Sequence, residues 1–168
     1  MINNYIEKRL QKDSHLRSSI DKMLAEGEVF FEHNLTSLNI SGYRYDINEA
    51  VEELALEEEI IVQLVEDYII QILKSNILFY KYIQKLKEEK DRGEFLDYTN
   101  IRNLAHKNLG VVRNLRIKDA IKILEEMMKE RDLEHLELCV KALEISAVRL
   151  DPETAYETIK LIRVKNFL

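Results

Sequence analysis

The chain has 168 residues, of which 46% are apolar and 33% are charged, and its net charge is −6. This composition is typical of a soluble globular protein of one domain and excludes a disordered chain. Four glycines and one proline leave few turns, which excludes an all-β fold, and the single cysteine excludes a disulfide framework or a cysteine-rich zinc site.

Charge and hydropathy restrict the expected cellular location and the classes of partner. Uncharged stretches stay far shorter than the ~20 apolar residues that a membrane span needs, and the first ten residues lack a hydrophobic signal region. An isoelectric point of about 5.4 without a block of lysines and arginines argues against a nucleic-acid partner. We therefore expect a cytoplasmic protein with no membrane or nucleic-acid partner, while homo-oligomerisation stays open.

The N-terminal third is predicted to hold two helices joined by a connector. The first helix is expected from Asn4 to Ala25, ending near Gly27, because apolar residues recur weakly at helical spacing. Residues 29–45 are expected to be a connector, since short apolar pairs alternate there with Asn, Ser, Thr and Gly. Asp46 is a typical N-cap for a short helix over 47–54.

A long helix is predicted from Glu57 to about Lys90, because apolar residues keep three- and four-residue spacings along it. Ser75 and Asn76 fall on its apolar stripe, so a bend is expected there. Asp91-Arg92-Gly93 then breaks the pattern.

Four more amphipathic helices are predicted in the C-terminal half. Asp132 is the expected N-cap of the third of them, and Asp151-Pro152 is a strong start signal for the last. Short links between long helices favour an all-α fold, an antiparallel helical bundle. The expected ranges are from about residue 98 onward, 117–128, 133–147 and 152–165.

The helix from about Tyr98 carries the most informative segment, Leu104-Ala105-His106-Lys107-Asn108-Leu109-Gly110. At 100° per residue, His106 lies roughly 140° from Ile101, which belongs to the apolar arc. The imidazole is therefore expected to face solvent. The same outer face and its flank carry Arg102, Lys107, Gly110 and Arg113.

Gly110 is open to two interpretations. A glycine inside an exposed helix costs about 1 kcal/mol relative to alanine, so its presence suggests that another surface must come close. Alternatively, Gly110 ends the helix as a C-terminal cap. The apolar spacing continues from Val111 to Ile117, which favours the first interpretation.

From about Asp46 to Leu150, the chain resembles a histidine-containing phosphotransfer (HPt) domain. Leu104-Ala105-His106 matches the family's Ala-His pair, Gly110 stands at the family's offset from the histidine, and Asn114-Leu115 is in register. Upstream, residues 60–68 are similar to the family's apolar helix. Downstream, two amphipathic helices with a short link match the family's final pair.

The resemblance implies a four-helix bundle of HPt type over residues 46–150. Residues 1–45 would be an N-terminal helical extension and connector, and 151–168 a C-terminal helix packed on the bundle.

The resemblance also implies a phosphorelay carrier in two-component signalling. His106 would accept a phosphoryl group from an aspartate of a receiver domain and pass it on, since a neutral imidazole is a competent nucleophile near pH 7. The implied partners are a response-regulator receiver domain or a hybrid histidine kinase. Mg²⁺ would belong to the partner, and this protein would need no cofactor and would have no independent turnover.

The chain departs from the family motif at several positions, including Val111, Val112 and Arg116 where the family has small residues. Leu109 stands where the family has a lysine that helps to neutralise the phosphoryl group, and Asn108 stands where it has a leucine. Arg102, Lys107 or Arg113 is expected to supply the charge instead. The departures also favour an alternative, a pseudo-HPt adaptor that binds a receiver or kinase without accepting phosphate. A third reading is a structural helical partner that dimerises through its N-terminal helix.

Other histidines and the cysteine offer weaker candidates. His135 and Cys139 are four residues apart on one predicted helix, a spacing that can place two metal ligands on one face. Cys139 lies beside the apolar stripe, so we expect it in the core. His15 and His33 are expected on the surface.

Overall fold

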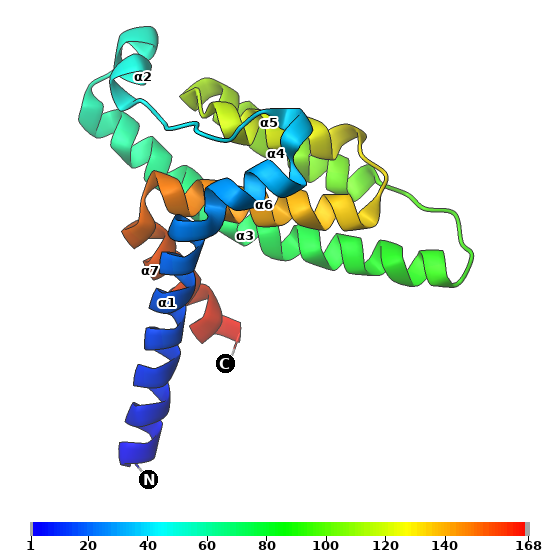
Figure 1. Cartoon of the computed structure of the whole chain (residues 1–168), viewed down its shortest axis with the longest axis horizontal. Helices are drawn as coiled ribbons and strands as arrows, with labels where there is room; N and C mark the ends of the chain where they lie inside the picture. The colour runs from blue at the N-terminus through cyan, green and yellow to red at the C-terminus, as the bar shows by residue number, and fades with distance from the viewer. Residues whose placement is uncertain (1, 167–168) are drawn as a thin grey trace.

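The computed structural model describes residues 2–166 and places no strand among them. Its helices are labelled in Figure 1. In chain order they are α1 (Ile2–Asn34), the short 3-10 helix η1 (Thr36–Leu38), α2 (Ile47–Leu54), α3 (Glu58–Asp91), α4 (Thr99–Leu115), α5 (Lys118–Lys129), α6 (Leu133–Leu150) and α7 (Pro152–Asn166). The predicted all-α fold is confirmed.

Four of these helices form a bundle in which each has two neighbours. α3 packs against α4 and α6, and α5 packs against the same two helices. Figure 1 shows that α3, α4, α5 and α6 run in alternating directions, as short links between consecutive helices require. α2 packs on α3, close to where the long helix begins.

α1 and α7 cover one side of the bundle. α1 contacts α6 and α7, and α7 contacts α3 and α6. Among the α1 side chains that the structure describes, burial begins at Leu16, and Figure 1 shows the N-terminal half of α1 extending away from the bundle. The proposed division into residues 1–45, 46–150 and 151–168 stays a prediction. No helix in the described part of the chain is long and apolar enough to cross a membrane.

The first helix is longer than predicted. It runs through Gly27 and ends at Asn34, so the connector begins after residue 34. Gly27 is buried, and a Cβ added there would lie 2.8 Å from Ile145 Cγ2 on α6. The glycine therefore allows α1 and α6 to approach closely. The expectation that it ends the helix was wrong, because the sequence does not show which helix faces it.

Three predicted helix starts are confirmed by their capping hydrogen bonds. Asp46 accepts bonds from two backbone N–H groups in the first turn of α2. Asp132 accepts one from the first turn of α6, and Asp151 accepts one from the first turn of α7. These bonds satisfy N–H groups that have no partner within the helix itself.

The two polar residues on the apolar stripe of α3 are buried between helices. Asn76 Nδ2 donates to the backbone oxygen of Val140 on α6 at 3.4 Å. Ser75 Oγ accepts from Asn108 Nδ2 on α4 at 3.1 Å. α3 is one unbroken helix through both residues. Hydrogen bonds to neighbouring helices account for the burial of these side chains, and the bend stays a prediction.

Candidate functional site

α4 turns one side to the bundle core and the other to solvent. Its buried residues are Ile101, Ala105, Asn108, Leu109, Val112 and Leu115. Its exposed residues include Asn103, His106, Lys107, Gly110 and Arg113. The predicted outward direction of His106 is therefore correct, because the apolar spacing alone orients the helix.

His106 lies in the middle of α4 with an exposed side chain. Within residues 2–166, no hydrogen bond or ion pair occupies its imidazole. An imidazole that is free of internal partners keeps a ring nitrogen available to an incoming electrophile or metal. This side chain is an exposed nucleophile on the outer face of α4.

Gly110 follows His106 by about one turn and leaves open space beside it. A Cβ added at Gly110 would meet no atom within 4 Å. The helix continues to Leu115 and ends with Arg116 in the left-handed conformation at φ 64. Gly110 is not among the described glycines with positive φ. The alternative interpretation, in which Gly110 caps the helix, was therefore wrong.

The three basic residues predicted to support His106 differ in exposure and in whether they form an ion pair. Arg102 is half-buried, and its guanidinium lies 5.4 Å from the ring centroid of Tyr98. Arg113 is exposed and forms an ion pair with Glu125 on α5, with 3.3 Å between Nη2 and Oε1. Lys107 is exposed and has no ion-pair partner within the described residues.

Charge is distributed unevenly between α4 and the rest of the chain. The chain as a whole has a net charge of −6. α4 contains no aspartate or glutamate but carries Arg102, Lys107 and Arg113 in addition to His106. α4 therefore contributes only basic charges to its outer face, one of which is paired with Glu125 of α5, and these charges favour an anionic group.

Two of the positions that depart from the HPt motif, 108 and 109, face the core. Leu109 is 1% exposed. Asn108 is fully buried, and its amide accepts a hydrogen bond from Gln71 Nε2 at 3.0 Å while donating to Ser75 and to the backbone oxygen of Leu104. These bonds satisfy a polar side chain that would otherwise destabilise the core. A cation beside His106 must therefore come from the outer face of α4.

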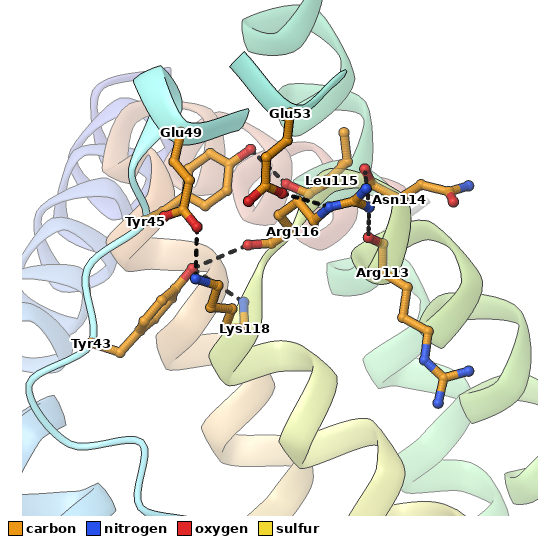
Figure 2. A network of polar contacts seen from close by, with 9 residues as sticks. All are labelled: Tyr43, Tyr45, Glu49, Glu53, Arg113, Asn114, Leu115, Arg116 and Lys118. Carbon is orange, nitrogen blue, oxygen red and sulfur yellow. Dashed lines mark hydrogen bonds and ion pairs between the residues drawn. The ribbon is translucent and has the colours of Figure 1, made fainter. Parts of the chain in front are cut away.

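The C-terminal end of α4 is held by the segment that precedes α2 (Figure 2). Tyr45 Oη donates to the backbone oxygen of Leu115 at 2.8 Å. Tyr43 Oη donates to the backbone oxygen of Arg116 and accepts from the N–H of Lys118 at 3.1 Å. These contacts satisfy backbone groups that a helix end leaves unpaired.

Two ion pairs add α2 to the same network. Arg116 Nε lies 2.8 Å from Glu53, and Lys118 Nζ lies 2.8 Å from Glu49. Figure 2 shows the side chain of Arg113 pointing away from this network, although its backbone oxygen accepts a bond from Arg116. The network therefore fixes the end of α4 and leaves the outer face around His106 uncovered.

Cys139 is buried, as predicted, and burial raises the pKa of its thiol to about 12. His135, which the sequence pairs with Cys139, lies instead beside Glu126 and Glu130. One potential ligand atom from each of these three residues lies within 4.8 Å of the others. Sequence analysis missed this group, although the four-residue spacing of the two glutamates at the end of α5 is a visible signal.

No protein-family model, curated protein or solved structure matches this chain.

Proposed function

We propose that this protein is a phosphorelay carrier in which His106 accepts a phosphoryl group from a receiver-domain aspartate. The observation that carries the proposal is an exposed, unpaired imidazole in the middle of a bundle helix, one turn from a glycine with open space around it. The HPt-like motif around His106 points to the same chemistry.

The transfer needs only a nucleophile and charge neutralisation from this chain. A neutral ring nitrogen of His106 attacks the phosphorus, the P–N bond forms, and the P–O bond to the partner aspartate breaks. The aspartate leaves as a carboxylate on the partner. Phosphoryl transfer depends mainly on positioning and on cations around the equatorial oxygens. The basic outer face of α4 supplies such cations.

Gly110 keeps the approach to His106 unobstructed. Residues four apart on a helix lie about 5–6 Å apart at their Cβ atoms. A side chain at position 110 would therefore stand beside the imidazole, where a receiver domain has to dock. Since an added Cβ meets no atom within 4 Å among the described residues, internal packing does not explain the glycine.

A direct test uses phosphorylated receiver domains as donors. Wild-type protein should acquire acid-labile, base-stable label, and His106→Gln should acquire none. His15→Gln and His33→Gln are matched controls, because both residues are exposed histidines on α1. Label that persists in His106→Gln would exclude His106 as the acceptor.

The three cations should contribute unequally to transfer. Lys107→Gln should slow transfer most, because Lys107 is the unpaired exposed cation next to His106. Arg113→Gln should have less effect, since Glu125 already neutralises Arg113. Single-turnover transfer rates from one phosphorylated receiver would rank the variants, with Lys122→Gln on α5 as the control.

The second candidate, an adaptor without phosphorylation, is favoured by one observation. Position 109 carries a buried leucine, so the family's cation next to the glycine is missing. For an adaptor, no receiver transfers label, but a receiver or kinase still binds. Gly110→Gln should then abolish that binding and His106→Gln should preserve it, while Asn100→Gln at the start of α4 serves as the control.

A further inference from the structure

A second group of reactive side chains lies where α5 turns into α6, on residues that the proposed phosphotransfer does not use. Glu126 belongs to the last turn of α5, Glu130 follows that helix, and His135 belongs to the first turn of α6. All three are partly buried, with side-chain exposures of 16%, 26% and 23%.

His135 directs its Nε2 atom toward both carboxylates, within ion-pair distance of each but without a hydrogen bond to either. The atom lies 3.6 Å from Glu126 Oε1 and 3.9 Å from Glu130 Oε2. It is shielded from solvent and has no hydrogen-bond partner within the described residues. A shielded ring nitrogen without a partner is destabilising unless something satisfies it.

Contacts within the turn hold each carboxylate in place, and for Glu126 the contact is with Lys129 Nζ, 3.6 Å from Oε2. Glu130 Oε1 accepts hydrogen bonds from the backbone N–H groups of Arg131 and Asp132, both at 2.9 Å. These two bonds fix the Oε1 atom of Glu130, and its second oxygen, Oε2, lies 3.9 Å from His135 Nε2. Tyr98 Oη donates to the backbone oxygen of Arg131 at 2.8 Å and ties the turn to α4.

The distances fit a bridging metal ion better than a hydrogen bond. A tetrahedral zinc ion with bonds of about 2.0–2.2 Å to nitrogen and oxygen holds its ligand atoms about 3.3 Å apart. The two separations from His135 Nε2, 3.6 and 3.9 Å, exceed this value by roughly 0.3 and 0.6 Å, and the three ligand atoms all lie within 4.8 Å of one another, so small side-chain rotations would bring them around one ion. Imidazole with carboxylates suits zinc and similar transition metals, whereas calcium and magnesium prefer oxygen ligands alone.

We propose that Glu126, Glu130 and His135 form a binding site for a zinc ion at the α5–α6 turn. One ring nitrogen and two carboxylate oxygens would bind the ion, and the remaining coordination position would be taken by water. The ion would join the end of α5 to the start of α6 and would neutralise two partly buried carboxylates. The site is independent of phosphotransfer at His106.

The test uses the full chain, stripped of metal with a chelator and then titrated with zinc chloride by calorimetry. We expect one zinc ion per chain with a dissociation constant below about 10 μM. Zinc at about 100 times that constant should raise the melting temperature by about 5–10 °C, because the ion binds the folded chain alone. Calcium at the same concentration should not raise it.

Variants locate the ion. His135→Asn and Glu126→Gln should each weaken zinc binding at least about tenfold, and two variants are used so that one unfolded protein does not leave the question open. His15→Asn and His33→Asn, which change exposed histidines of α1, should bind zinc as the wild type does. The absence of binding, an equal effect of calcium, or binding that survives both ligand substitutions would overturn the proposal.

Discussion

The contact between α1 and α6 and the outer face of α4 each contain a glycine within a helix, but the surroundings of the two glycines are opposite. At Gly27 an added Cβ would lie 2.8 Å from Ile145, whereas at Gly110 it would meet nothing within 4 Å. A glycine in a helix costs stability in both places. At Gly27 the close packing of two helices offsets that cost.

At Gly110 nothing within the described chain offsets it. The residue lies beside His106 on a helix whose own charged side chains are all basic. The contrast shows that a glycine inside a helix can lie either at a close helix contact or on an accessible surface. The atoms around an added Cβ distinguish the two cases. Gly110 is therefore consistent with the proposed docking of a receiver domain, whereas Gly27 is explained by the contact between α1 and α6.

The largest expected change in stability comes from a substitution on the buried side of α4, at the residue before Gly110. Leu109→Lys should lower the free energy of unfolding by about 3 kcal/mol or more, because it places an unpaired charge in the core. Asn103→Lys, on the outer side, should change it by no more than about 0.5 kcal/mol. Urea unfolding measures both, and a tolerated lysine at position 109 would show that α4 is oriented differently.

Gly27→Val tests the packed glycine. It should lower the free energy of unfolding by about 1–3 kcal/mol, because the added carbons collide with Ile145. The loss should be smaller when Ile145→Ala is already present, since the two side chains share the same space. Additive losses in this double-mutant cycle would mean that the glycine does not serve the α1–α6 contact.

Gly110→Ala should stabilise the protein, whereas Gly27→Val should destabilise it. It should raise the free energy of unfolding by up to about 1 kcal/mol, because alanine favours the helix and its Cβ meets no atom. Thermal melts at one pH compare it with the wild type. A lower melting temperature would mean that the glycine has a structural role, and the contrast with Gly27 would fail.

The smallest expected effect is a pH dependence of stability that arises from Tyr45 at the C-terminal end of α4. Burial raises the pKa of Tyr45 to about 12 from its ordinary value of 10. Between these values the unfolded chain releases the phenol proton while the folded chain keeps it, so the free energy of unfolding falls as pH rises from 10 to 12. Tyr45→Phe removes this contribution.

The measurement compares urea unfolding of the wild type and Tyr45→Phe at pH 8 and pH 11. At pH 8 the wild type should be more stable, because Tyr45 donates a hydrogen bond to the backbone oxygen of Leu115. The difference should narrow at pH 11. A difference that is constant with pH would show that the phenol does not titrate differently in the folded chain.

The sequence predicted correctly those features that depend on residues only a few positions apart in the chain. The caps at Asp46, Asp132 and Asp151 bond to N–H groups two or three residues away, so each helix start is visible locally. The outward direction of His106 follows from the helical repeat and the apolar residues around it. These features did not require knowledge of any neighbouring helix.

The tertiary structure decided the features that join distant parts of the chain. Tyr45 reaches the end of α4 across 70 residues of sequence, and Gly27 meets Ile145 on another helix. His135 lies beside Glu126 and Glu130 because α6 packs back against α5. A helical repeat tells which side of a helix is apolar, but the close packing of side chains determines which other helix covers that side.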